Sequence, residues 1–299
     1  MTGTVLILGA TGRFGRNAAI AFREAGWTVH CFDRKTQDLK RSVEGVDVVV
    51  NAWNPAYPDW ARQVPELHRD VINAAADHGA TVILPGNVYV FGAQTPGPWS
   101  GATPHAAQNP LGRIRVEMEE AYRKSSVRTI LLRAGDFIDT CVSGNWFDQV
   151  MIKPLARGKM VYPGRPDIPH AWAYLPDLTR AAVALADIRQ DLPRFCEVPY
   201  AGFTLTGRDI AQSLSRVTGA EIAVSPMKWW PIQALRPFWK LAPHLVEMRY
   251  LWDLPHSLDG AFFDDLIPGF QTTDLDAAMD SAIPKTAKQK ATLVRTARA

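Results

Sequence analysis

Three glycines near the N-terminus, Gly9, Gly12 and Gly15, have a spacing that could hold a phosphate group. They follow an apolar run, residues 5–8, and open a segment with helical periodicity, residues 13–25. A strand that passes through such a turn into a helix presents backbone N–H groups and a positive dipole end to a pyrophosphate. We expect Gly9 to allow the tight turn, Gly12 to admit the pyrophosphate and Gly15 to let the helix pack closely.

The second apolar run, residues 28–32, ends in Asp33. An acid about twenty residues beyond such glycines can accept hydrogen bonds from the adenosine ribose hydroxyls. This favours a dinucleotide site over an ordinary strand–helix turn. Asp33 favours NAD, whereas Arg13, Arg34 and Lys35 could meet a 2′-phosphate and favour NADP, so the choice within NAD(P) stays open. Thr11 and Phe14, inside the glycine turn, complete this part of the predicted site.

A third, mostly apolar run, residues 46–51, ends in Asn51 and leads into a loop that begins with Ala52 and Trp53. Ligands of open α/β sheets bind at the carboxyl ends of the strands, so these three residues are predicted to contact the cofactor. Trp53 has two interpretations, a wall of the cofactor or substrate crevice and a lid over the core.

Polar groups suited to acid–base chemistry follow two more apolar runs, residues 81–84 and 127–132. Asn87 can donate an amide N–H to a carbonyl, Tyr89 can donate a proton, and Asp136 can accept one or bind substrate. The alternatives are a buried aromatic with a bonded hydroxyl for Tyr89 and a cap or turn acid for Asp136.

Two histidines, His105 and His170, lie in predicted loops, where surface positions are commoner than catalytic ones. Neither has a partner at metal-ligand spacing, and Asp264 and Asp265 have no histidine neighbour, so no metal site is predicted.

Strands alternating with helices, the latter over residues 13–25, 59–78 and 111–124, predict an α/β fold with a doubly wound parallel sheet of the Rossmann type. Residues 1–157 form the expected NAD(P)-binding domain, and residues 170–190 are expected to return to it. Residues 158–299 form the expected smaller, mostly helical substrate domain with a basic tail. In this part we expect helices at 145–157, 176–187, 206–217 and 275–282, a strand at 196–200 and a loop over 158–174.

Composition limits the class of protein. The chain has 299 residues, 47% of them apolar, which suits one large or two moderate domains. The net charge of +3 is weak, and the tail after Pro284 carries five basic residues and no acid. Without this tail the rest of the chain is slightly acidic, which argues against a broad nucleic-acid surface. Three separated cysteines suggest reduced thiols, with Cys31 in the core. No signal peptide or bilayer-length apolar run is visible, so a cytoplasmic protein without a membrane partner is expected.

The tryptophans at positions 229, 230, 239 and 252 have three interpretations: core of the small domain, a wall of an apolar substrate pocket, or an interaction surface. Their aromatic area favours an apolar or aromatic-bearing substrate over a bare sugar.

The glycine spacing resembles that of the extended and atypical branches of the short-chain dehydrogenase/reductase superfamily. Segments 87–92, 110–115, 133–136 and 173–178 are similar to that family's Ser-x-x-x-Tyr-Gly, Pro-Tyr-Gly-x-x-Lys, Arg-x-x-Asn and Val-x-Asp-Leu segments. Their order and spacing resemble the NAD-dependent epimerase/dehydratase group over most of the first 190 residues.

Departures from the family pattern concern the reacting groups. The resemblance implies a Ser or Thr, a Tyr and a Lys around the reacting oxygen, but these positions hold Asn87, Leu111 and Arg115. Leucine has no proton to give, and arginine stays charged at neutral pH, although Arg115 could still bind the nicotinamide ribose.

The sequence therefore supports two hypotheses. The first is an NAD(P)-dependent oxidoreductase, epimerase or dehydratase acting on a small carbonyl or hydroxyl compound. The second is a non-catalytic protein that senses a dinucleotide and changes its binding to a protein partner. The resemblance also implies a possible homodimer that pairs through the helix from Leu111.

Overall fold

A six-stranded parallel sheet forms the centre of the computed structural model, which describes residues 2–288. Its strands lie in the order β2 (Thr28–Phe32), β1 (Thr4–Leu8), β3 (Val48–Asn51), β4 (Thr81–Gly86), β5 (Thr129–Arg133) and β9 (Phe195–Pro199). From β1 the chain passes outward to β2 and then crosses to β3 on the other side. Ligands bind outside the carboxyl ends of the strands at such a switch point. The predicted doubly wound parallel sheet is confirmed.

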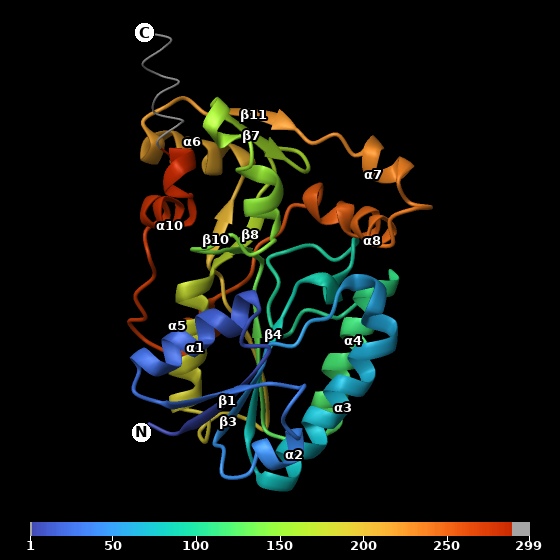
Figure 1. The fold of residues 1–299 in the computed structure, drawn as a ribbon, viewed down its shortest axis with the longest axis vertical. Coiled ribbons are helices and arrows are strands. Elements are labelled where there is room, and N and C mark those ends of the chain that lie inside the picture. The colour runs from blue at the N-terminus through green and yellow to red at the C-terminus, as the bar shows by residue number, and fades with distance from the viewer. Residues whose placement is uncertain (1, 289–299) are drawn as a thin grey trace.

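Helices cover both faces of this sheet (Figure 1). One face carries α1 (Arg13–Glu24) and α5 (Leu175–Asp187), and the other carries α3 (Trp60–His78) and α4 (Pro110–Lys124), with the short α2 (Leu39–Ser42) beside α3. Successive residues of β1 serve opposite faces: Val5 and Ile7 pack in the core under α1 and α5, Leu6 and Leu8 in the core under α3 and α4. A strand covered on both faces needs apolar residues throughout, which explains the uninterrupted apolar runs.

The large sheet includes chain from beyond residue 157. The helix α5 packs against α1, and β9 pairs with β5, so both belong to this layered unit. The domain boundary at residue 157 stays a prediction.

Two small sheets and several helices make up the second part of the molecule. The first sheet has the order β10 (Phe203–Leu205), β8 (His170–Tyr174) and β6 (Asp136–Ile138), and the second pairs β11 (Ala223–Pro226) with β7 (Lys159–Tyr162). The helices are α6 (Gly207–Thr218), α7 (Trp230–Ala234), α8 (Ala242–Glu247), α9 (Ala261–Leu266) and α10 (Leu275–Ala282). A third core joins these elements around Phe147, Trp172, Leu214 and Trp252, except for α9, which packs through Phe263 in the core under α1 and α5.

Three sequence expectations are wrong. Residues 158–174 are not a loop, because β7 and β8 pair there with distant strands that the local sequence does not reveal. Residues 145–157 form only a π-helical turn, Phe147–Met151, and a 3-10 turn, Leu155–Arg157. Cys31 is exposed rather than in the core, because β2 lies at the sheet edge.

Further 3-10 turns lie at Tyr57–Asp59, Tyr89–Phe91 and Met248–Trp252. The first two follow β3 and β4, where they position side chains of the site described below. Across residues 2–288, no helix combines the length and the apolar character that crossing a membrane requires.

Candidate functional site

The turn between β1 and α1 has the geometry that phosphate binding needs. Gly9 has a φ of +76°, in the left-handed region, and its carbonyl accepts a 2.9 Å hydrogen bond from the Gly12 N–H. A Cβ on Gly15 would lie 2.2 Å from the Gly9 oxygen, so only glycine allows this approach. Gly12 is the N-cap of α1 and no side chain caps it, which leaves N–H groups of the first turn open to an anion.

The other residues predicted in this turn differ in what they offer. Thr11 is exposed, whereas the Phe14 side chain is buried in the core and leaves only its backbone to a ligand. Arg13 donates from Nε to the Ser143 carbonyl at 2.8 Å and from Nη2 to the Gly144 carbonyl at 2.5 Å. The first turn of α1 is thereby attached to the loop after β6.

Asp33 lies exposed at the end of β2, as the predicted ribose-binding position requires. Its carboxylate accepts hydrogen bonds from the Lys35 backbone N–H at 2.9 Å and from Thr36 Oγ1 at 3.2 Å. These bonds fix the turn in which Arg34 is also exposed. The choice between NAD and NADP stays open on this geometry.

The residues at the carboxyl end of β3 have two different roles, one in packing and one in the candidate site. The Asn51 side chain is buried and donates to the Tyr122 hydroxyl at 3.0 Å, with His68 Nδ1 3.2 Å away. Burial lowers the pKa of His68 to about 3, so this trio is a neutral packing element. Ala52 and Trp53, by contrast, face the glycine turn, since a Cβ on Gly9 would meet Ala52 O and Trp53 Cδ1.

The family's tyrosine and lysine positions, Leu111 and Arg115, are both buried on α4. Arg115 Nη2 donates to Asn54 Oδ1 at 2.9 Å, and the guanidinium carbon lies 4.3 Å from the Trp60 ring centroid. Burial lowers the Arg115 pKa from its usual value, and the nearby Glu119 carboxylate raises it.

Two phenols meet beside this arginine. The Tyr57 and Tyr89 hydroxyls are 2.6 Å apart, and both pKa values are raised, chiefly by burial. The charge of Asp136 also raises both pKa values, whereas Arg115 lowers them, so these charged groups act on the same pair. Both hydroxyls are therefore protonated at neutral pH.

A carboxylate–imidazole pair completes this set. Asp136 Oδ2 and His170 Nε2 are 2.8 Å apart, with the Asp136 side chain 31% exposed. The His170 ring stacks on Trp252 at 4.5 Å and meets His256 edge-on at 4.3 Å. His170 lies buried in β8, so the expectation of a surface loop residue is wrong. We call Tyr57, Tyr89, Arg115, Asp136 and His170 the phenol cluster.

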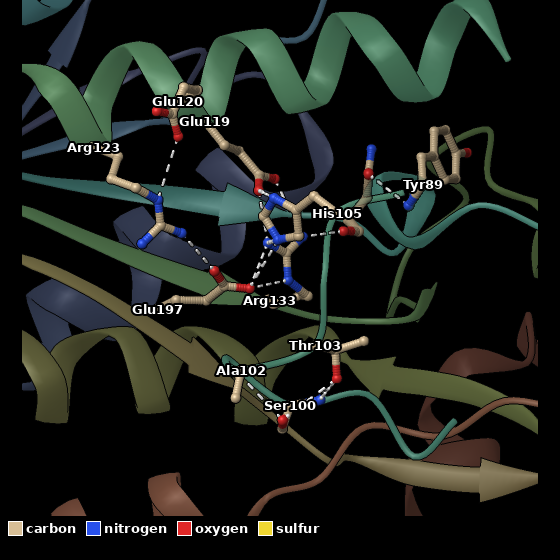
Figure 2. A network of polar contacts seen from close by, with 11 residues as sticks. Tyr89, Ser100, Ala102, Thr103, His105, Glu119, Glu120, Arg123, Arg133 and Glu197 are labelled. Atoms are coloured by element: carbon tan, nitrogen blue, oxygen red, sulfur yellow. Dashed lines mark hydrogen bonds and ion pairs between the residues drawn. The ribbon is translucent and has the colours of Figure 1, made fainter. Parts of the chain in front are cut away.

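A second set of charged residues lies at the same sheet edge (Figure 2). Arg133, at the end of β5, is fully buried and donates to Glu119 Oε2 at 2.7 Å and Glu197 Oε1 at 2.8 Å. His105 lies 3.5 Å from Glu197, and Arg123 lies 3.2 Å from it. We call these five residues the ion cluster.

The ion cluster differs from what the family resemblance implies. Arg133 occupies the position of an arginine that touches substrate, but both of its carboxylate partners are internal. It also donates to the Asn87 carbonyl, while Asn87 Oδ1 accepts from the Tyr89 N–H at 3.0 Å. Figure 2 shows the Tyr89 ring lying away from Glu197 and Glu119. The ion cluster therefore supports the backbone that carries Asn87 and Tyr89.

The structure thus brings Tyr89 and Asp136 together with Arg115, and places Asn87 between the two clusters. Tyr57 and His170 were not among the predicted site residues. Tyr57 follows the loop after β3, at the predicted ligand edge, which is the one signal that could have identified it. Within residues 2–288 no group of three or more His, Cys, Asp or Glu side chains could hold a metal ion.

A parallel sheet with a glycine turn at its switch point and polar groups on the next strand ends defines a Rossmann-type protein of the short-chain dehydrogenase/reductase class. Residues 3–162 match the family described as RmlD substrate binding domain, and the chain belongs to that family. The predicted resemblance to the extended epimerase/dehydratase group is confirmed. No curated protein matches the sequence.

Solved structures of similar fold span nearly the whole chain. MoeE5 in complex with UDP-glucose and NAD has a TM-score of 0.70 at 15% identity and covers 99% of this chain and 100% of its own. UDP-glucose 4-epimerase from Brucella ovis in complex with NAD has a TM-score of 0.72 at 18% identity, with coverage of 97% and 99%. A dTDP-4-dehydrorhamnose reductase from Clostridium acetobutylicum has a TM-score of 0.69 at 16% identity, with coverage of 93% and 98%.

Proposed function

We propose that this protein is an NAD(P)-dependent enzyme of the reductase or epimerase type, acting on a small carbonyl or hydroxyl compound. The observation that carries the proposal is the phenol pair Tyr57–Tyr89, held beside Arg115 and Asp136 at the same sheet edge as the glycine turn. The NAD complexes of MoeE5 and the Brucella ovis epimerase support the choice of cofactor.

The residues present fit a dinucleotide. The uncapped start of α1 at Gly12, next to Thr11 and Arg13, would hold the pyrophosphate. Asp33 and Arg34 would hold the adenosine ribose. Ala52 and Trp53 would contact the part of the dinucleotide that lies over the glycine turn. Arg115 would bind the nicotinamide ribose, because its charge replaces that of the family's lysine. When bound, the reduced cofactor supplies a hydride to the carbonyl carbon.

Tyr89 takes the role of proton donor in this proposal. As the carbonyl is reduced, the Tyr89 hydroxyl gives its proton to the developing alkoxide, and Asn87 donates an amide N–H to the same oxygen. Because burial and Asp136 raise the Tyr89 pKa, the phenolate is disfavoured. The phenol is therefore protonated before the reaction, as a proton donor must be. Asp136 and His170 would position the substrate, and the partly exposed Asp136 would let a proton from solvent reach the phenolate after the product has taken up the first one.

A titration with NADH and NADPH, followed by calorimetry, tests the first half of the proposal. We expect tight binding of at least one, and weaker binding by the Gly12→Ala variant. Gly12 has an ordinary φ of −77° and a Cβ there would lie 3.2 Å from Gly9 O, so the variant should fold while covering the phosphate site. Gly101→Ala is the matched control, with its Cβ 3.3 Å from Glu197 O in another loop. Tight binding of neither nucleotide would overturn the proposal.

The second candidate, a dinucleotide-sensing protein without catalysis, is supported by one observation. Leu111 is buried in the core where the family has its reacting tyrosine, so α4 offers no hydroxyl at that position. A panel of nucleotide sugars and small apolar carbonyl compounds, supplied with the reduced cofactor that binds, separates the two candidates. Turnover of any member supports the enzyme. A cytoplasmic location and a homodimer paired through α4 also remain proposals.

A further inference from the structure

The segment that carries α7 and α8, residues 228–246, exposes an unusual amount of apolar surface. Trp230 is 67% exposed, Leu235 46%, Phe238 85% and Trp239 39%. These are four of the seven large apolar side chains that are exposed within residues 2–288. Figure 1 shows the turn between α7 and α8 projecting from the side of the molecule. We call residues 228–246 the aromatic hairpin.

Charge on the aromatic hairpin has one sign. Lys228, Arg236 and Lys240 are exposed, and the sequence from Met227 to Val246 contains no Asp or Glu. The exposed aromatic rings are therefore interleaved with cations, and the hairpin itself carries no carboxylate. Trp and Phe beside Lys and Arg is the composition of protein segments that lie in the headgroup region of an anionic lipid bilayer.

The base of the hairpin is firmly attached, so its exposed side chains have a fixed direction. Trp229 is buried, and its indole donates to the Pro163 carbonyl at 2.6 Å. At the other end, Glu247 Oε1 accepts from the Leu111 N–H at 2.7 Å and from Asn109 Nδ2 at 2.8 Å. These bonds fix both ends of the hairpin, so that Trp229 packs in the core while Trp230 and Phe238 stay exposed.

We propose that the aromatic hairpin docks the protein on an anionic lipid surface, with Trp230 and Phe238 entering the headgroup region and the three cations meeting lipid phosphates. No apolar run of the sequence could span a bilayer, which by itself predicts no membrane partner. A segment that lies on the surface needs no such run. A second copy of this chain fits less well, because an isologous contact would bring Lys228, Arg236 and Lys240 against their own counterparts.

Docking would also orient the candidate site. The hairpin continues into α8, where the His244 ring centroid lies 6.4 Å from that of Tyr57. A bilayer in contact with the hairpin would therefore lie on the same side of the molecule as Tyr57 of the phenol cluster.

Vesicle flotation with the full-length protein tests the proposal. One set of vesicles contains roughly 30% phosphatidylglycerol in phosphatidylcholine, and the other is phosphatidylcholine alone. We expect partitioning into the anionic vesicles to be about tenfold or more above the neutral ones, and to fall at high salt. The double variant W230S/F238S should lose about tenfold or more of this binding. Phe262→Ser, which removes a ring that is 44% exposed elsewhere, should change it by less than about twofold.

A second variant tests the charges separately. Neutralising Lys228, Arg236 and Lys240 to Gln should lower binding to anionic vesicles by about tenfold or more, with binding to neutral ones unchanged. Neutralising Lys290, Arg295 and Arg298, which lie outside the described residues, should leave most binding intact. Each variant is checked for NAD(P)H affinity in solution, which the hairpin should not alter. Absence of vesicle binding by the wild type overturns the proposal, as does binding that only the tail variant abolishes. Self-association that W230S/F238S abolishes, without vesicle binding, would instead identify a dimer interface.

Discussion

The ion cluster and the phenol cluster lie at the same edge of the large sheet but differ in how their polar groups are paired. In the ion cluster, the Arg133 guanidinium is fully buried between two carboxylates, Glu119 and Glu197. In the phenol cluster, Asp136 is 31% exposed and the phenols bond to each other. A buried charge whose partners are all inside the protein, such as Arg133, stabilises the fold. Protonated phenols beside a partly exposed carboxylate can instead interact with a ligand.

This contrast explains how one edge of the sheet serves two purposes. Arg133 also donates to the Asn87 carbonyl, two residues before Tyr89. The paired charges therefore hold the backbone from which the phenol projects. A partly exposed site depends on neighbouring groups that hold its backbone in place.

Arg133→Ala should give the largest effect. It leaves Glu119 and Glu197 buried without their shared cation, which typically costs about 3–5 kcal/mol of unfolding free energy. Urea unfolding followed by tryptophan fluorescence measures this. A loss below about 1 kcal/mol would mean that water reaches the carboxylates and that the ion cluster is not sealed.

Tyr89→Phe should act on rate and spare stability. Loss of the proton donor is expected to lower single-turnover hydride transfer by about 10²–10⁴-fold, with cofactor affinity nearly unchanged. Tyr250→Phe is the matched control, since the Tyr250 hydroxyl is buried, has no hydrogen-bond partner and lies outside the phenol cluster. Equal rates in the two variants would remove Tyr89 from the mechanism.

Acid should weaken the two regions in sequence. Burial and the neighbouring His170 lower the pKa of His256, which packs on the phenol cluster, to about 3. The folded state therefore favours the neutral ring, and this stability is complete above about pH 6.5 and lost as pH falls toward 3. For Glu197, burial alone would raise the pKa, but His105 and Arg133 bring it below its usual value, so the ion cluster keeps its contribution until about pH 4.

The contribution of His256 can be measured as the slope of unfolding free energy against pH. Unfolding free energy determined at several pH values between about 6 and 4.5 should fall less steeply in His256→Phe than in the wild type, by roughly 1.4 kcal/mol per pH unit. His68, whose pKa is also about 3, should account for a similar slope that remains in the variant. Identical slopes in both proteins would show that His256 does not titrate in this range.

Arg123→Ala should give the smallest effect. Its guanidinium lies 3.2 Å from Glu197 Oε2, but the side chain is 44% exposed, so water can replace the pair. We expect a loss of about 0.2–1 kcal/mol in the same urea experiment. A loss comparable to that of Arg133→Ala would extend the sealed cluster to the protein surface.

Much of the fold follows from local sequence. The apolar runs locate the strands of the large sheet, Thr206 caps α6 through a bond from the Asp209 N–H, and α10 covers the predicted residues. The glycine turn was predictable for the same reason, because its conformation is set within a few residues. The cofactor and catalytic roles assigned to individual residues stay predictions.

The remainder depends on partners that are distant in the chain. The strand β8 lies in a proline-rich stretch and exists because β6 and β10 pair with it. Arg133 meets Glu197 across 64 residues, and Tyr57 meets Tyr89 across 32. No spacing rule connects such residues, so the sequence identified Tyr89 and Asp136 as polar groups at strand ends without showing their partners.

The strand order also bears on how the protein is made. After β2 has paired with β1, β3 joins the other edge of β1, and β4, β5 and finally β9 each join the free edge of the strand that precedes it in the sheet. Synthesis delivers β1 to β5 in this same direction, so these five strands can assemble during translation, whereas β9 arrives more than 60 residues after its partner β5. The small sheets also wait for distant segments. The strand β7 emerges more than 60 residues before its partner β11, and it must stay unpaired in the nascent chain until then.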